Sequence, residues 1–198
     1  MSNPDLIIYA VHVAFWGAFG IVRLILRSSE HDQLTKKSTS EKKQTAPFSK
    51  ALIVFHMLAF GVMYFGIAKA ALPNRVPVWF MGQQIVGSVV IALGAILIAW
   101  ALIFFRSWRF RAKLDAGHKL ATGGPFKILR HPIYMGLNLL ALGTAIWIPT
   151  LIVWAGFLLM ILGSDFRART EESLLKRVFG VIYENYCSHT RRFLPGIY

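Results

Sequence analysis

Cysteine and acidic side chains are both scarce in this sequence. Cys187 is the single cysteine among 198 residues, so no disulfide can form within the chain. Asp and Glu number 9 against 22 Lys and Arg, which gives a formal net charge of +13. The sequence also has no Cys/His cluster of the kind that binds a metal, and no Asn-x-Ser/Thr sequon. We therefore expect neither a disulfide-stabilised scaffold nor a metal site.

The common local signatures of soluble enzymes are absent too. The sequence contains no Gly-x-Ser-x-Gly elbow, no P-loop, no His-Glu-x-x-His pair, and no Gly-x-Gly-x-x-Gly after a strand. The N-terminus lacks the basic region and the small-residue cleavage site of a signal peptide. We therefore expect the first apolar run to be a retained helix. Any catalytic activity should depend on a less common arrangement of side chains.

Apolar residues are abundant instead. The chain is 56% hydrophobic and 16% charged, and its apolar residues cluster in runs near the roughly 20 residues that cross a bilayer. This pattern predicts a polytopic membrane protein built as a single unit, 1–198. The basic residues lie between and after the apolar runs, which is typical of topology signals and contacts with anionic lipid rather than of nucleic-acid binding.

The apolar runs predict an all-α fold with about five transmembrane helices. The first three fall at about 6–26, 51–72 and 82–105. A fourth run is too long for one crossing and contains Pro149, which removes a backbone donor and interrupts a helix. It is therefore predicted to form a hairpin of two short arms, about 133–147 and 150–164.

The tail, 165–198, is predicted to be helical and to lie outside the membrane. Apolar side chains recur at helical spacing, and Gly180 is a plausible helix stop before a second short helix, "VIYENYCSH". The predicted apolar stripe consists of Phe166, Thr170, Leu174 and Val178, widened by Leu175, Phe179 and Ile182.

Lys and Arg concentrate in 27–50, in 106–132 and in the tail. Because such residues favour the cytoplasmic side, five spans with the N-terminus outside place all three segments in the cytoplasm. The two polar segments that flank the hairpin then lie beside each other.

Two segments are candidates for a functional site. In "GHKLATGGPFKILRHPIY", Arg130, His131 and Tyr134 stand where the chain enters the membrane, and such groups need a partner or a role there. In "DFRARTEE", Arg167 and Glu171 lie one helical turn apart. That pair is either an intrahelical salt bridge or a grip on a ligand that carries both signs of charge.

The order of these motifs resembles a known family. "GHKLATGGPFKILRHPIYMG", an apolar hairpin, "RARTEESLLKRVFGVIYENY" and "RRFLP" resemble the membrane methyltransferases typified by isoprenylcysteine carboxyl methyltransferase, a superfamily that includes phospholipid N-methyltransferases. The resemblance covers about 106–198, so 1–105 would supply three spans with their loops and 106–198 the cofactor-binding core.

The resemblance implies S-adenosylmethionine as methyl donor and a hydrophobic or lipid-linked acceptor entering from the bilayer. It implies Arg167 as the catalytic residue that faces the acceptor's carboxylate, and Glu171 as a ligand of the donor. The remaining implied donor-binding residues are His118, Lys119, Leu120, Ala121, Phe126, His131, Pro132, Ile133 and Tyr134.

The sequence does not decide the identity of the methyl acceptor. Arg111 stands where the eukaryotic enzymes have glutamine, and the third span lacks their intrahelical arginine. Carboxyl O-methylation of an isoprenylcysteine-like acceptor is the favoured activity. Phospholipid N-methylation, an NADPH-dependent sterol-type reductase and a non-catalytic scaffold are the alternatives. An integral membrane location with a cytoplasmic site is expected, favouring a prokaryotic inner membrane over the endoplasmic reticulum.

Overall fold

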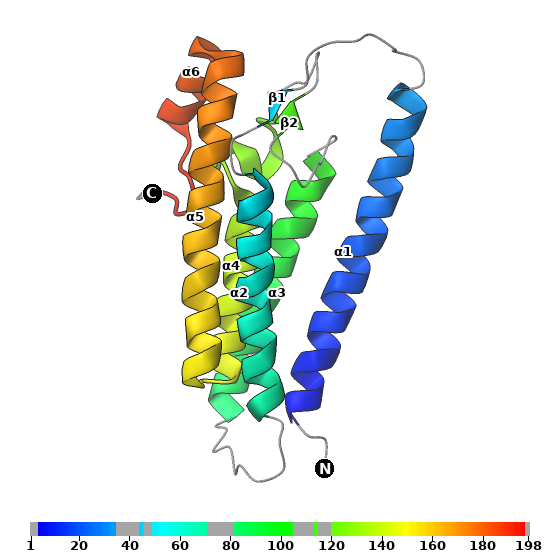
Figure 1. The fold of residues 1–198 in the computed structure, drawn as a ribbon, viewed down its shortest axis with the longest axis vertical. Coiled ribbons are helices and arrows are strands. Elements are labelled where there is room, and N and C mark those ends of the chain that lie inside the picture. The colour runs from blue at the N-terminus through cyan, green and yellow to red at the C-terminus, as the bar shows by residue number, and fades with distance from the viewer. Residues whose placement is uncertain are drawn as a thin grey trace.

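In the computed structural model, five long helices stand side by side and a short sixth helix packs against the end of the fifth (Figure 1). The structure describes residues 4–34, 44–45, 49–70, 81–104, 113–114 and 120–196. The helices are α1 Pro4–Leu34, α2 Ser49–Ala70, α3 Met81–Phe104, α4 Pro132–Trp147, α5 Leu151–Phe179 and α6 Val181–His189. A short 3₁₀ helix, η1 Gly124–Lys127, precedes α4.

The all-α prediction is confirmed, with one small addition. Two-residue strands β1 Gln44–Thr45 and β2 Lys113–Leu114 pair antiparallel, so the loop after α1 meets the loop after α3. The helices of the first half pack on those of the second, because α3 lies along α4 and α2 lies along α5. The description of 1–198 as one unit, with 1–105 and 106–198 as its parts, stays a prediction.

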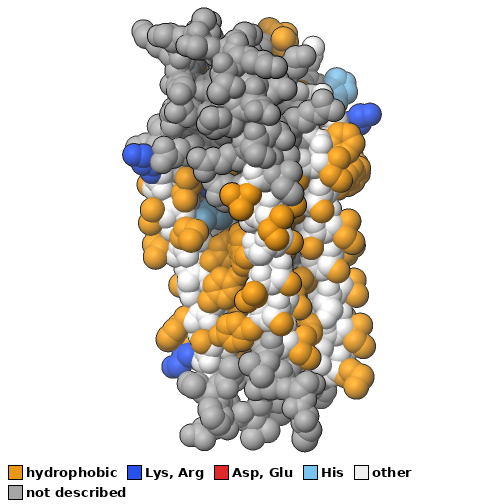
Figure 2. Space-filling model, turned by 90° about the vertical axis from the view of Figure 1, so that its right-hand side faces the viewer, with side chains coloured by type: hydrophobic (Ala, Val, Ile, Leu, Met, Phe, Trp, Pro, Cys, Tyr) orange, Lys and Arg blue, Asp and Glu red, His pale blue; other side chains and the backbone are white. Residues whose placement is uncertain are grey.

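Each of the five predicted spans overlaps one of the helices α1 to α5, but α1 continues to Leu34, past the predicted end near residue 26. Among the described residues, α2, α3 and α5 are long and apolar enough to cross a membrane, while Ile7–Val22 of α1 and α4 are shorter apolar helices. On the face shown in Figure 2, hydrophobic side chains cover the middle of the described part, and the Lys and Arg side chains coloured there lie above and below this apolar region. Such an apolar belt with charged ends is what a bilayer requires, and the chain is an integral membrane protein.

The predicted break at Pro149 is confirmed, but the length of the second hairpin arm is wrong. Helix α4 ends at Trp147, and α5 starts at Leu151 with the Thr150 hydroxyl accepting from the Val153 amide. Instead of ending near 164, α5 runs without interruption to Phe179. The second arm of the hairpin and the predicted tail helix therefore form one continuous helix, because helical hydrogen bonds do not depend on where the side chains become polar.

Gly180 ends α5 as predicted. Its φ of 51° is strained for other residues, and α6 begins at the next residue. The predicted apolar stripe of the tail is wrong in part, since Phe166 and Val178 are exposed and only Leu174 is buried. The buried face of α5 carries Arg167 and Glu172 instead, because their partners lie at the start of α4 and in the C-terminal segment, residues 190–196.

Glycines set the close approach of α3 to α4. Gly87 faces Gly143, and Gly94, two turns later on α3, faces Gly136, two turns earlier on α4. A Cβ on Gly94 would lie 2.6 Å from the Gly136 carbonyl oxygen, and one on Gly87 would lie 2.7 Å from that of Gly143. Small residues that let backbones touch are a main source of helix association in membranes, since lipid and side chains are equally apolar.

We expect Gly94→Ala to lower the melting temperature of the purified protein in detergent, because the new methyl group overlaps the α4 backbone. Overpacking of this kind typically destabilises by about 1–3 kcal/mol. Gly61→Ala on α2 is the matched control, since nothing lies within 4 Å of its Cβ position. Equal melting temperatures for the two variants would contradict the close α3–α4 contact.

Candidate active site

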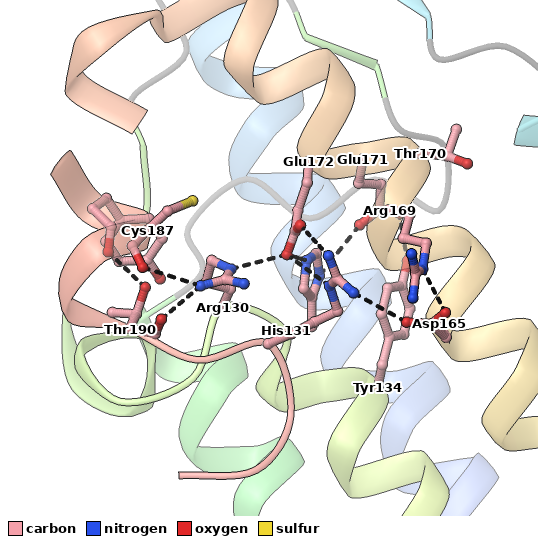
Figure 3. Close-up of polar contacts among 12 residues, drawn as sticks. Arg130, His131, Tyr134, Asp165, Arg169, Thr170, Glu171, Glu172, Cys187 and Thr190 are labelled. Atoms are coloured by element: carbon pink, nitrogen blue, oxygen red, sulfur yellow. Dashed lines mark hydrogen bonds and ion pairs between the residues drawn. The ribbon is translucent and has the colours of Figure 1, made fainter. Parts of the chain in front are cut away.

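The hairpin places the start of α4 beside the last turns of α5. His131 precedes α4 and Tyr134 lies in its first turn, while Arg167, Glu171 and Glu172 lie on the part of α5 that returns to the same end. Figure 3 shows these two helices presenting His131, Tyr134, Glu171 and Glu172 to one another. Two segments about 35 residues apart in sequence thus form one cluster, as the hairpin prediction required.

Tyr134 is at the centre of the first half of this cluster. Its hydroxyl donates to Glu171, and its ring centroid lies 5.0 Å from the Arg167 guanidinium carbon. The ring also stacks on that of His131, with centroids 5.6 Å apart and nearly parallel planes. Arg167 Nη2 lies 3.6 Å from Glu171 Oε1. The Arg167–Glu171 pair is therefore more than an intrahelical salt bridge, because an aromatic wall from α4 lies against it.

Glu172 is the centre of the second half. Its Oε1 lies 2.9 Å from Arg130 Nε and 3.3 Å from His131 Nε2, and its Oε2 accepts from Arg192 Nη2 at 2.7 Å. Arg130 also donates to the carbonyl oxygens of Thr190 and Cys187. Arg130 and Glu172 thus join α4, α5 and the C-terminal segment, and their contacts in the structure are to the protein itself.

The C-terminal segment closes over this side of the cluster. Backbone hydrogen bonds connect Arg130 N to Arg191 O at 2.7 Å, and Arg191 N to Ile128 O at 3.1 Å. The amide of His131 also donates to Arg192 O. Phe193 is buried beside His131, with ring centroids 6.0 Å apart. The segment thereby fixes the backbone from which His131 projects.

The glycine-containing turn before α4 is held by contacts with two other helices. Gly124 has a φ of 54°, and a Cβ there would overlap the ring of Phe104. Phe126 in η1 is buried, and its carbonyl accepts from the Tyr186 hydroxyl at 2.7 Å. Burial raises the pKa of Tyr186, so that hydroxyl stays protonated and remains a donor. The turn is therefore attached to α6 as well as to α3.

The predicted site residues separate into three groups. His131, Tyr134, Arg167 and Glu171 come together. Phe126, Pro132 and Ile133 are buried in the packing around the cluster, and Leu120 and Ala121 are half-buried before η1. His118 and Lys119 lie outside the described residues.

Two contributors were not recognised from the sequence. Arg192 contacts Glu172 and also Asp165, at 3.2 Å, although it lies 20 residues further along the chain. His56 on α2 is buried 6.0 Å from the Tyr134 ring, between centroids. A histidine within an apolar span was the signal that could have found it. In the described part of the chain, no group of three His, Cys, Asp or Glu side chains could hold a metal ion.

A family model described as phospholipid methyltransferase matches residues 82–181, just over half of the chain. The matched region includes His131, Tyr134, Arg167 and Glu171. The chain belongs to the phospholipid methyltransferase family. The methyltransferase resemblance expected from the sequence is thereby confirmed at the level of the family, and the family match favours it over the reductase and scaffold alternatives.

Curated plant proteins named as protein-S-isoprenylcysteine O-methyltransferases are similar to the chain. It is 31% identical over 136 residues to a "Probable protein-S-isoprenylcysteine O-methyltransferase" of Oryza sativa subsp. indica, covering 63% of this chain and 66% of that protein. It is 32% identical over 116 residues to "Protein-S-isoprenylcysteine O-methyltransferase B" of Arabidopsis thaliana, covering 56% and 58%. The matches thus span just under two thirds of the length of the rice protein.

The fold is similar to that of a solved structure. The eukaryotic intramembrane Ras methyltransferase, isoprenylcysteine carboxyl methyltransferase, superposes with a TM-score of 0.63 at 21% sequence identity, over 100% of this chain and 69% of that chain. At this level of identity the likeness shows a shared intramembrane fold.

We expect Glu172→Gln to destabilise the protein strongly, because it leaves Arg130 and Arg192 without their shared carboxylate in a buried setting. Removing one partner of a buried ion pair costs about 3–5 kcal/mol. Thermal unfolding in detergent measures this loss. Glu184→Gln on the exposed surface of α6 is the control and should change stability by less than about 0.5 kcal/mol. Unfolding of the Glu172 variant at the wild-type temperature would show that the carboxylate is not a centre of the fold.

Proposed function

We propose that this chain is an S-adenosylmethionine-dependent membrane methyltransferase that methylates a carboxylate oxygen of a hydrophobic, lipid-linked acceptor, with an isoprenylcysteine-like acid as the favoured acceptor. The observation that carries the proposal is the cluster of Tyr134, Arg167 and Glu171, placed where an apolar hairpin emerges into a charged end. Family membership and the named relatives support it.

The side chains present suit such a methyl donor. Glu171 offers a half-buried carboxylate for an ammonium group by a charge-assisted hydrogen bond, and the faces of Tyr134 and His131 suit a cationic sulfonium. Leu120, Ala121, Phe126, Pro132 and Ile133 are proposed to complete this wall through backbone and apolar contacts. His118 and Lys119 retain their proposed role from the family resemblance alone.

The acceptor's chemistry follows from Arg167. Its guanidinium is buried against Tyr134 and within 3.6 Å of Glu171, so it presents a fixed positive charge beside the proposed donor. S-adenosylmethionine supplies an electrophilic methyl group on a good leaving group, so an ionised carboxylate needs no general base. The work left to the protein is to orient the carboxylate oxygen in line with that methyl group and to exclude water.

The acceptor is proposed to reach the site sideways from the bilayer, with its charged head at this end and its apolar part among the helices. The Lys and Arg distribution supports a cytoplasmic orientation of this end. A prokaryotic inner membrane is the proposed location. The family model's description keeps phospholipid N-methylation as the second candidate. Labelled S-adenosylmethionine incubated with membrane extracts separates the two, since an ester product is base-labile and a methylated amine is not.

Donor binding gives the first test. We expect S-adenosylhomocysteine to raise the melting temperature of the wild type, and Glu171→Gln to abolish that shift because the ammonium group loses its carboxylate. Glu184→Gln should keep the shift, and NADPH should produce none. A wild-type melting curve that millimolar S-adenosylhomocysteine leaves unchanged would refute the proposed donor.

Acceptor binding gives the second test. We expect Arg167→Met to lower kcat/KM for an acidic acceptor on the order of 100-fold, since a charged hydrogen bond contributes about 1.5–3 kcal/mol, while the shift by S-adenosylhomocysteine persists. The control is Arg169→Gln, whose side chain is 58% exposed and faces Asp165. Methyl transfer that survives Arg167→Met at the wild-type rate would exclude Arg167 as the carboxylate's partner.

A further inference from the structure

Residues 126–131, which lead from the glycine-containing turn to the start of α4, lie along residues 186–192 of α6 and the C-terminal segment. Backbone hydrogen bonds join the later part of this pair, from Arg191 N to Ile128 O and from Arg130 N to Arg191 O. Because these bonds run between backbone groups, they do not depend on which side chains are present. The approach to α4 is therefore fixed at its second end by the chain itself.

The first end of residues 126–131 is held by a side chain instead. The Tyr186 hydroxyl donates to the carbonyl oxygen of the buried Phe126 at 2.7 Å, from a position 60 residues further along the chain. The amides of Leu129 and Arg130, which would continue the helix towards this carbonyl, donate to other acceptors. The Tyr186 hydroxyl thus takes the place of a helical donor where η1 ends.

Loss of this hydrogen bond is expected to move the turn relative to the start of α4. A buried carbonyl that loses a donor bears the cost of its desolvation, so the backbone shifts to recover a partner. Only four residues, 127–130, separate Phe126 from His131, and the later ones are held by their backbone bonds to the C-terminal segment. The turn would therefore move while His131 stays in place, and the two would no longer be aligned.

We propose that Tyr186 is a positioning residue for the methyl donor: its hydroxyl fixes the Phe126 carbonyl and so aligns the turn with His131, without itself contacting the donor. This inference rests on the proposed function, since it takes Phe126 and His131 to be parts of one donor-binding wall. It gives α6, which contributes no side chain to the cluster of Tyr134, Arg167 and Glu171, a role in donor affinity.

Tyr183 on the same helix offers a matched comparison. It is 1% exposed, and its ring centroid lies 5.9 Å from that of Tyr186. In the described part of the chain its hydroxyl has no hydrogen-bond partner. A Tyr→Phe change at either position removes one hydroxyl group from α6, but only the change at Tyr186 removes a hydrogen bond to the turn.

Donor affinity gives the main test. We expect Tyr186→Phe to raise the dissociation constant of S-adenosylhomocysteine about tenfold, because part of the binding energy is spent on realigning the turn. Tyr183→Phe should keep the wild-type constant. Titration of S-adenosylhomocysteine into purified protein in detergent measures the three constants, and the melting temperature without ligand shows that each variant is folded. Equal constants for the wild type and Tyr186→Phe would overturn the inference.

Kinetics distinguish positioning from a general structural role. With labelled S-adenosylmethionine and an N-acetyl-S-prenylcysteine as acceptor, we expect Tyr186→Phe to raise KM for the donor about tenfold, while kcat and KM for the acceptor keep their wild-type values. A variant that is merely less well folded would lose kcat or bind both substrates more weakly. Equal increases of the two KM values would therefore contradict a specific role in donor binding.

Hydrogen–deuterium exchange separates this inference from the proposed function. Without any ligand, the amides of residues 123–129 should exchange faster in Tyr186→Phe than in the wild type or in Tyr183→Phe, because the turn has lost its attachment to α6. If the wild type does not bind S-adenosylhomocysteine, the proposed donor fails while this comparison still decides whether Tyr186 holds the turn. Equal exchange in all three proteins would overturn the inference whatever the affinities.

Discussion

The carboxylate of Glu172 is the interaction on which the rest of this site depends. Two segments that are far apart in the chain bring three cationic or ionisable groups to it: Arg130 and His131 before α4, and Arg192 near the C-terminus. A buried carboxylate is unfavourable alone, and so is each buried guanidinium. Their mutual satisfaction therefore requires that the hairpin, α5 and the C-terminal segment assemble together, which also sets the position of the neighbouring Glu171.

Towards the opposite end of the bundle, buried polar groups are satisfied by hydrogen bonds between uncharged side chains. His12 Nε2 lies 2.9 Å from Thr144 Oγ1, His12 Nδ1 lies 2.9 Å from the Tyr64 hydroxyl, and Trp16 donates to that hydroxyl at 2.6 Å. Because Thr144 donates to Leu140 O, it accepts from His12, and every polar atom of this chain of bonds has a partner. This cluster joins α1 to α2 and α4.

The sequence predicted the helices well because bilayer thickness and proline chemistry act locally. The three early spans, the break at Pro149 and the stop at Gly180 needed no knowledge of tertiary contacts. The continuation of α5 past 164 was missed because polarity changes there while the backbone pattern does not. The cluster of His131, Tyr134, Arg167 and Glu171 could be predicted from the order of the motifs. Phe126, which the family resemblance names as a donor-binding residue, is buried in the packing around this cluster.

Contacts that depend on tertiary packing could not be predicted from the sequence. Nothing local indicates that Arg192 reaches Glu172, or that His56 on α2 lies beside Tyr134, because each depends on how α2, α5 and the C-terminal segment pack. The same is true of the two adjacent glutamates. Consecutive residues on a helix point about 100° apart, so one faces Tyr134 and the other faces Arg130, and only the packing decides which.

That division between the glutamates has a chemical consequence. Glu172 is held by two guanidiniums at hydrogen-bonding distance and by His131, so a ligand that drew it away would leave several buried charges unpaired. Glu171 has Arg167 at 3.6 Å and His131 at 3.8 Å, both longer than a hydrogen bond, and one neutral donor in Tyr134. In the proposed function, Glu171 faces the cationic donor and Arg167 faces the anionic acceptor. A carboxylate that joins the segments of the site, beside a second one with fewer charged partners, suits the proposed binding of a cation and an anion side by side.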